Sequence, residues 1–203
     1  MTNGGYDEGY LAVPCLWGTS AGSLVQKFLA KNRITKSITV LDLGCGEGKN
    51  SAVFARLGCH VDAVDCSAAA INNGRSTFRD VDINWLEEEA QNFEIKVGFY
   101  DVIIAYGLLH CFHSERVIEK TIERIQAGTK SGGSNIVCSF NNRSHDLSAH
   151  PGFHPTLLPH QWYIQRYAKW DRIFDSDADL YETHPHNNVP HYHSLTRLIA
   201  RKL

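Results

Sequence analysis

The sequence predicts a single α/β domain built on a mainly parallel β-sheet, and three observations lead to this fold class. The chain has 203 residues, the usual size of one such domain. Up to about residue 140, short apolar runs rich in β-branched residues alternate with helical patterns, and this alternation requires crossovers that place strands in parallel. The last third instead has two strand-like segments joined by the short turn "PHNNVP", so we expect an antiparallel end to the sheet.

Each element follows from its own pattern of apolar and capping residues. Thr19 or Ser20 and then Ser67 stand where helix N-caps are expected, Gly58 stands where a helix ends, and "KSGG" at 130–133 predicts a turn. A helix over 114–126 turns four apolar residues inward, namely Val117, Ile118, Ile122 and Ile125. The other expected helices cover 21–32, 50–58, 67–78 and 160–170, and the expected strands cover 37–44, 59–65, 82–88, 99–106, 134–140, 171–184 and 191–203.

Composition favours a small-molecule partner in the cytoplasm. With 20 Lys and Arg against 22 Asp and Glu, the formal net charge is −2, so no overall basic field attracts nucleic acid or an anionic membrane. The six cysteines form no C-x-x-C pair, which is typical of reduced intracellular thiols. The first ten residues lack the features of a secretory signal, and no stretch approaches 18 apolar residues. We expect a cytoplasmic protein.

The stretch "LDLGCGEGKNS" at 41–51 predicts a glycine turn that holds a ligand between a strand and a helix. Three ligand classes compete: a nucleoside triphosphate, a dinucleotide and S-adenosylmethionine. A triphosphate loop that starts at Gly44 needs its next glycine at position 49, and a dinucleotide turn needs glycine or alanine there. Position 49 is Lys49, so both patterns fail.

The charge of the turn favours the third ligand. Asp42 comes two residues before Gly44, at the tip of the strand, and its carboxylate would repel a pyrophosphate but attract an ammonium or a sulfonium group. S-adenosylmethionine carries both of these cations. Its carboxylate would meet the free amides at the start of the next helix, near Lys49 and Asn50.

Further cofactor contacts are expected at the carboxyl ends of the following strands. Asp65 ends the second strand, 21 positions after Gly44, and would accept hydrogen bonds from ribose hydroxyls. Glu89 follows the third strand and would accept from the adenine amino group, although it also fits a solvated acidic face. Aromatic residues of the N-terminal arm would cover the sulfonium, or simply pack. The expected cofactor-binding residues are Asp42, Gly44, Cys45, Gly46, Gly48, Asn50, Asp65, Cys66, Glu89, Ala90, Tyr106, Tyr6, Tyr10 and Trp17.

The methyl acceptor is expected beyond the fourth strand. His110 is the candidate catalytic residue, as a general base for a hydroxyl acceptor, because imidazole titrates near neutral pH. The alternative is a histidine at a helix start beside Ser114. The expected acceptor-side residues are His113, Asn141, Arg143 and the segment 145–167, with Arg143 available to an anionic acceptor.

The histidines near the C-terminus raise a separate metal hypothesis. His184 with His186, and His191 with His193, form i, i+2 pairs across a turn, so each pair can share one strand face and the two pairs can form a tetrad. No carboxylate or thiol stands at a clear ligand spacing from them, and histidine-rich loops also occur as polar surface. We therefore assign no metal site from the sequence; zinc titration tests the tetrad.

These motifs resemble those of class I S-adenosylmethionine-dependent methyltransferases. "VLDLGCGEG", "HVDAVD", "YDVIIAYGLLHCF" and the "GG" before "SNIVCSF" carry the resemblance over residues 38–140. It implies a Rossmann-like, seven-stranded sheet with the last strand inserted antiparallel and helices on both faces. "GEGKNSAVFARLG", "WYIQRYAKW" and "HSLTRLIARKL" resemble the tellurite-resistance methyltransferase family, from which the N-terminal "YDEGYLAVPCLWG" and the loop rich in His and Pro depart.

The expected layout is one methyltransferase domain over 1–203. Residues 1–37 would form the lid and lead-in helix, 38–140 the cofactor-binding core, 141–170 the substrate-side loop and helix, and 171–203 the antiparallel hairpin. The expected reaction is in-line methyl transfer to a small molecule, such as a metalloid oxyanion, a thiol or an O or N acceptor, with S-adenosylhomocysteine as product. The alternatives are a non-catalytic S-adenosylmethionine or metal-binding protein and, without the third glycine, an NAD-dependent oxidoreductase.

Overall fold

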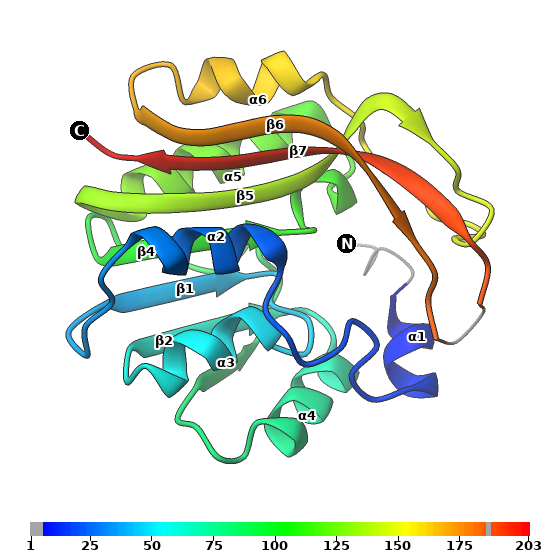
Figure 1. The fold of residues 1–203 in the computed structure, drawn as a ribbon, viewed down its shortest axis with the longest axis horizontal. Coiled ribbons are helices and arrows are strands. Elements are labelled where there is room, and N and C mark those ends of the chain that lie inside the picture. The colour runs from blue at the N-terminus through cyan, green and yellow to red at the C-terminus, as the bar shows by residue number, and fades with distance from the viewer. Residues whose placement is uncertain (1–5, 186–187) are drawn as a thin grey trace.

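A computed structural model describes residues 6–185 and 188–203, and a seven-stranded sheet runs through the middle of the molecule (Figure 1). The strand order is β3-β2-β1-β4-β5-β7-β6. The strands are β1 (Thr39–Leu43), β2 (His60–Asp65), β3 (Asn84–Glu87), β4 (Tyr100–Tyr106), β5 (Thr129–His145), β6 (Asp171–Glu182) and β7 (His191–Arg201). The helices are α1 (Asp7–Ala12), α2 (Ser23–Lys31), α3 (Lys49–Arg56), α4 (Ala68–Thr77), η1 (Leu109–Cys111), α5 (Glu115–Gly128) and α6 (His160–Arg166).

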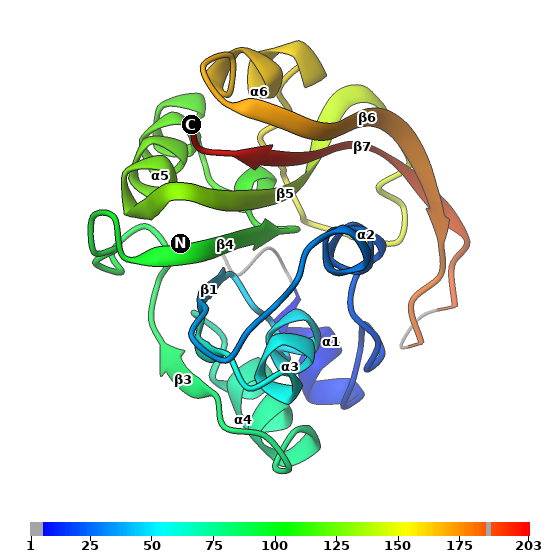
Figure 2. The ribbon, with the colours of Figure 1, turned by 60° about the vertical axis from the view of Figure 1, so that its left-hand side comes forward.

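The strand β7 is the antiparallel member of the sheet. It pairs antiparallel with β5 on one side and β6 on the other, whereas the pairs among β1, β2, β3, β4 and β5 are parallel. The expected fold class and its antiparallel C-terminal strand are therefore confirmed. Figure 2 shows that β6 and β7 extend beyond the rest of the sheet and curve away from it toward the end of β6 and the start of β7.

Alternate residues of the buried strands pack on opposite faces, so the sheet needs helices on both. Val40 belongs to the core beneath α2 and α3, while Leu41 and Leu43 belong to the core beneath α5 and α6. Figure 1 shows α2 and α3 in front of the sheet and α5 behind it. This alternation decides which side chains of β1 can reach a ligand.

Two of the helix starts expected from the sequence have the expected N-cap residue, and a third does not. Ser67 caps α4 by accepting from the Ala70 N–H at 3.1 Å, and Ser114 caps α5 by accepting from Val117. For α2 the cap is Gly22, not Thr19 or Ser20. A Cβ at Gly22 would lie 2.6 Å from the Tyr106 ring, so this close approach requires glycine.

Two further differences concern chain segments with glycine or aromatic residues. The "KSGG" stretch is not a free turn but part of β5, where the register to β4 shifts and a Cβ on Gly133 would lie 2.8 Å from the Asp101 carbonyl oxygen. The arm at 7–12 forms α1, which packs on α4. Among the described residues, no helix combines the length and apolar character needed to cross a membrane.

Candidate functional site

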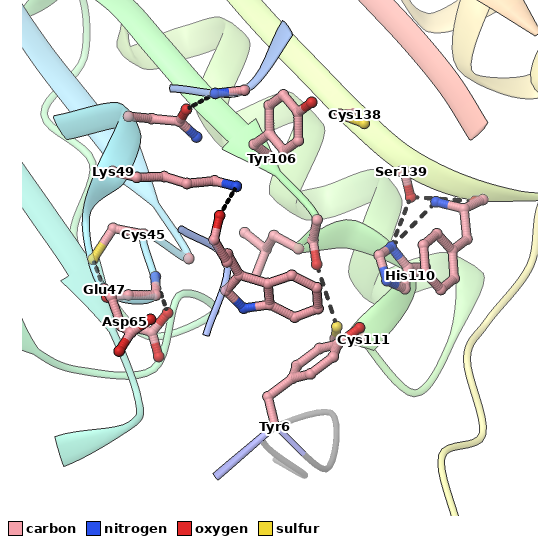
Figure 3. Close-up of a pocket in the computed structure, with 18 of the residues that line it drawn as sticks. Tyr6, Cys45, Glu47, Lys49, Asp65, Tyr106, His110, Cys111, Cys138 and Ser139 are labelled. Carbon is pink, nitrogen blue, oxygen red and sulfur yellow. Dashed lines mark hydrogen bonds between the residues drawn. The ribbon is translucent and has the colours of Figure 1, made fainter. Parts of the chain in front are cut away.

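A cavity of about 400 Å³ opens at the carboxyl ends of the central strands (Figure 3). Its walls come from the turn after β1, the end of β2, the residues after β4 and the middle of β5. Residues from the N-terminal arm and from β6 and β7 close its other sides. A cavity of this size and position is where open α/β sheets bind small ligands.

The glycine turn approaches the cavity with its backbone. The N–H groups of Gly44 and Cys45 donate to the Val64 carbonyl at 2.8 and 2.9 Å, which fixes the turn to the end of β2. Gly44 and Gly46 have φ values of +73° and +55°, in the left-handed region that favours glycine. A Cβ on Gly46 would lie 2.8 Å from the Tyr10 hydroxyl, so a side chain here would fill the space beside the turn.

Asp65 lies on the cavity wall with its carboxylate held by two backbone amides. Oδ2 accepts from the Gly46 N–H at 2.7 Å and Oδ1 accepts from the Ser67 N–H at 2.9 Å. Burial raises the pKa of this carboxyl above its ordinary value, against the effect of these two hydrogen bonds. Each carboxylate oxygen has a further lone pair, so Asp65 can still accept from two ligand hydroxyls.

Asp42 does not line the cavity, and the expected direct contact is corrected here. It shares a strand face with Val40 and points under α3, where its Oδ2 accepts from the Ser51 hydroxyl at 2.7 Å. The residue is fully buried, and burial raises the pKa of its carboxyl to about 7. Asp42 therefore supports the glycine turn from beneath α3, and it can act on a ligand only through the electrostatic field of its carboxylate.

The three aromatic residues of the N-terminal arm, Tyr6, Tyr10 and Trp17, line the cavity. Trp17 donates from Nε1 to the Tyr10 hydroxyl at 3.2 Å, and the Tyr6 and Trp17 rings meet edge to face with centroids 5.4 Å apart. Lys49 anchors this cover, because its Nζ donates to the Trp17 carbonyl at 2.9 Å (Figure 3). Burial lowers the pKa of the Lys49 ammonium.

Other expected cofactor residues divide into two groups. Cys45, Cys66, Asn50 and Tyr106 line the cavity, and the Asn50 Oδ1 also accepts from the Gly22 N–H at 2.9 Å. Three residues are absent from the cavity wall, which corrects the expectation for Gly48, Glu89 and Ala90.

The physical reasons for these three placements are local. Gly48 is the N-cap of α3, with φ at +77° and the Trp85 ring against it. The chain turns away after β3 ends at Glu87, so the Glu89 carboxylate accepts from the Gln91 side chain at 2.8 Å and Ala90 is buried beside α5.

His110 lines the cavity, but its hydrogen bonds contradict a role as general base. The Phe140 N–H donates to Nδ1 at 3.2 Å, so in the neutral ring the proton sits on Nε2. Burial lowers the pKa of this imidazole to about 3, which keeps it neutral. Nε2 is buried without a hydrogen-bond partner among the described residues. His110 is thus arranged as a hydrogen-bond donor.

The other acceptor-side residues lie away from the cavity, and these expectations are corrected. His113 is exposed. The Arg143 guanidinium pairs with Asp177 and Asp179 at 3.0 and 2.7 Å on the outside of the sheet, so it is not available to an anionic acceptor. Asn141 is buried and donates to Asp177 at 2.8 Å. The segment 145–167 supplies no cavity-lining residue, and its Phe153 packs behind Tyr6 and His110.

Several lining residues were not expected from the sequence. Glu47 accepts from the Cys15 N–H at 2.8 Å and from the Asn73 side chain at 3.0 Å, which ties the arm to the glycine turn. Its place inside "GCGEGK" was a signal that could have identified it. Ser139, Phe140 and Glu182 have no such local signal, because pairing of β5, β7 and β6 brings them to the cavity.

Comparison with known proteins also indicates a methyltransferase. A family model described as a methyltransferase domain matches residues 40–133. An uncharacterized methyltransferase of Mycobacterium bovis is 29% identical over 101 residues, which are 50% of this chain and 50% of that protein. A protein named hemagglutinin 1 from Eikenella corrodens is 32% identical over 142 residues, 68% of this chain and 45% of that protein. The chain thus spans about half the length of these curated relatives.

The solved structure of TehB from Haemophilus influenzae has the same fold. It superimposes with a TM-score of 0.72 at 20% identity, over 90% of this chain and 62% of that one. The matching domain, the strand order and the cavity at the glycine turn all agree with a methyltransferase. Residues 40–133 are therefore a methyltransferase domain, and the chain has a class I methyltransferase fold that resembles that of TehB.

Proposed function

We propose that this chain binds S-adenosylmethionine in the cavity and transfers its methyl group to a small molecule held at the His110 end. One observation carries the proposal: the glycine turn and the Asp65 carboxylate form one wall of a cavity that three aromatic rings close. A ribose beside Asp65 places the attached sulfonium along the turn, toward His110 and Ser139. The proposed partner is therefore a metabolite-sized acceptor, in line with the net charge of −2.

The charges around the cavity suit the zwitterionic tail of this cofactor. Asp65 on the wall and Asp42 beneath the turn make one side negative, which favours the ammonium and the sulfonium. Lys49 and the side-chain amide of Asn50 line the same cavity and suit the carboxylate. A pyrophosphate at the turn would meet the Asp65 carboxylate directly and the charge of Asp42 through the turn, which disfavours a dinucleotide.

When bound, the cofactor supplies a methyl group already activated by the positive sulfur. The chain has to align the acceptor with that methyl and exclude water, and positioning of this kind is worth about 7–11 kcal/mol. The buried thiols of the cavity do not offer a covalent route: burial raises the pKa of Cys66 and Cys138 to about 11 and that of Cys111 to about 12. Thiols that stay protonated are poor nucleophiles, so direct transfer is favoured.

The His110 tautomer favours an acceptor that needs no base. A donor N–H next to Phe140 and Leu195 suits a soft oxyanion or a thiolate, whose lone pair attacks directly. A hydroxyl acceptor is the second candidate, because the Glu182 carboxylate lines the same cavity and burial raises its pKa above the ordinary value. Glu182→Gln should abolish transfer to a hydroxyl and leave transfer to a thiolate or oxyanion intact.

The test begins with the cofactor and continues with the acceptor. Native mass spectrometry of freshly purified protein should show bound S-adenosylmethionine or S-adenosylhomocysteine, and calorimetry should show binding of both but not of NADH. A panel of selenite, tellurite, thiols, amines and phenols should then release S-adenosylhomocysteine with at least one acceptor. Failure to bind either cofactor form would overturn the proposal. Tight binding without turnover on any acceptor would favour the non-catalytic binder instead.

A further inference from the structure

A cluster of histidines lies next to the cavity, where the loop after β5 meets the ends of β6 and β7. It consists of His150 from the loop, His184 after β6, and His191 and His193 at the start of β7, with the Glu182 carboxylate beside them. The rings of His184, His191 and His193 are buried. The Trp17 ring of the aromatic cover meets His184 edge to face with centroids 4.8 Å apart, so the cluster directly adjoins the cavity.

Three of the rings point Nε2 at Nε2 of the fourth, His150. The Nε2 atom of His150 lies 3.2 Å from Nε2 of His184, 3.2 Å from Nε2 of His191 and 3.3 Å from Nε2 of His193. Zinc binds histidine nitrogen at about 2.0–2.1 Å, and four such ligands at tetrahedral corners would lie about 3.3–3.4 Å apart. These three distances match the edges that meet at one corner of a tetrahedral metal site.

Hydrogen bonding between the rings does not account for this arrangement. A ring nitrogen carries either one proton or one lone pair, directed in the plane of the ring. The Nε2 of His150 can therefore make one good hydrogen bond, whereas three nitrogens surround it at contact distance. With a proton on this nitrogen the other two contacts can only be weak, off-axis hydrogen bonds, and without it they oppose lone pair to lone pair. A cation between the nitrogens converts all of these contacts into attractive ones.

Hydrogen bonds on the outer side of two rings fix their tautomers in the form that binds metal. His191 Nδ1 lies 2.8 Å from the Val189 carbonyl, so Nδ1 carries the proton and Nε2 presents its lone pair to the cluster. His145 donates from Nε2 to the Asn141 carbonyl, which leaves its Nδ1 to accept from the His193 Nδ1–H at 3.3 Å. His193 Nε2 therefore also presents a lone pair, and such outer partners are typical of metal-binding histidines.

Glu182 adds a negative charge on one side of the cluster. Its Oε1 lies 3.7 Å from His191 Nε2 and 3.8 Å from His193 Nε2, so two lone pairs and a carboxylate face one another. This arrangement is repulsive without a cation and suits a divalent ion, for which nitrogen and carboxylate oxygen are both good ligands.

We infer that His150, His184, His191 and His193 bind one divalent transition-metal ion of the zinc class, with Glu182 at the edge of the site facing the cavity. The tetrad expected from sequence contained His186, which lies outside the described residues, and lacked His150. The site goes beyond the proposed function and does not depend on it. A bound ion would fasten the loop after β5 to the β6–β7 hairpin at the mouth of the cavity.

The first experiment uses the full chain without an affinity tag, because a histidine tag binds the same metals. Metal analysis of the protein as purified and competition titration of chelator-treated protein with Zn²⁺ should give one ion per chain, bound at micromolar concentration or tighter. Cobalt(II) in place of zinc should give the visible absorption of a four-coordinate nitrogen site. No binding at micromolar zinc, or a six-coordinate cobalt spectrum, would overturn the inference without affecting cofactor binding.

Variants then assign the ligands. His150→Ala and His191→Ala should each weaken zinc binding by about 100-fold or more, and His145→Ala, which removes the outer partner of His193, by about 10-fold. His60→Ala is the matched control, since His60 is exposed at the opposite end of β2, and its zinc affinity should equal that of the wild type. Circular dichroism and S-adenosylmethionine affinity verify folding of each variant. Wild-type zinc affinity in folded His150→Ala and His191→Ala would exclude these ligands.

Discussion

The backbone N–H of Phe140 donates to Nδ1 of His110 at 3.2 Å, and the two rings stack with centroids 3.9 Å apart. Because the acceptor nitrogen is already occupied by a backbone donor, the imidazole faces the cavity with Nε2–H. The contact joins η1, which follows β4, to the middle of β5, so it fixes the chemistry of His110 through the backbone of a strand.

The first prediction follows from this tautomer. Nitrogen NMR of the folded protein should show His110 protonated on Nε2 and neutral from pH 8 down to about pH 4, since burial lowers its pKa to about 3. His113, which is exposed, provides the comparison within the same spectrum. A His110 titration near pH 6.5 would restore the general-base hypothesis.

The second prediction concerns the ribose contact. Asp65→Asn should weaken S-adenosylmethionine binding by about 10- to 100-fold, because hydrogen bonds to a charged group contribute about 1.5–3 kcal/mol. Glu89→Gln is the matched control: Glu89 is absent from the cavity wall, so its affinity in calorimetry should match the wild type. Equal losses of S-adenosylmethionine affinity in both variants would support the hypothesis that Glu89 contacts the adenine.

The third prediction concerns the space beside the glycine turn. Gly46→Ala should lower cofactor affinity by at least about 10-fold, because the new Cβ would displace the Tyr10 hydroxyl, 2.8 Å away, and with it the Trp17 cover. Gly98 has a similar φ of +60° but open space around it, so Gly98→Ala should cost only the strain of about 1–2 kcal/mol in thermal unfolding. Unchanged cofactor affinity in Gly46→Ala would show that the turn does not approach the ligand.

The fourth prediction concerns pH and stability. The Asp42 carboxyl has a pKa of about 7 in the folded protein and 3.8 as its ordinary value, so the unfolded chain loses this proton first as pH rises. The protonated Asp42 carboxyl makes its full contribution to the free energy of unfolding below pH 4. This contribution falls between pH 4 and 7, and above pH 7 the buried carboxylate lowers the free energy of unfolding by an amount on the order of 4 kcal/mol. Asp42→Asn mimics the protonated form.

Denaturant titration of both proteins across this range provides the measurement. The free energy of unfolding of the wild type should fall relative to Asp42→Asn from pH 4 to pH 7 and then stay level. A constant difference between the two proteins across the whole range would mean that Asp42 ionises normally beneath the turn.

The periodicity of the strands was enough to predict most of the sheet and Asp65. A strand end followed by a capped helix locates its last residue within narrow limits, and Ser67 provides that cap. The same periodicity could have excluded a direct contact between Asp42 and the ligand. Side chains alternate along a strand, so Asp42 shares a face with Val40 and lies under α3.

The acceptor side could not be predicted because it depends on pairing between distant strands. Arg143 has the chemistry to hold an anion, but β7 and β6 place Asp177 and Asp179 beside it, and no local pattern predicts that register. His150 is one of several histidines in a loop rich in proline and bears no spacing relation to His191. Only the folded hairpin brings the two nitrogens within 3.2 Å.

The edge contact between Trp17 and His184 joins the aromatic cover to the β6–β7 hairpin. Because the two residues lie far apart in the sequence, closing this contact requires a long loop closure and should come late in folding. The glycine turn, which is held by neighbouring strands, should therefore form before the cavity acquires its cover.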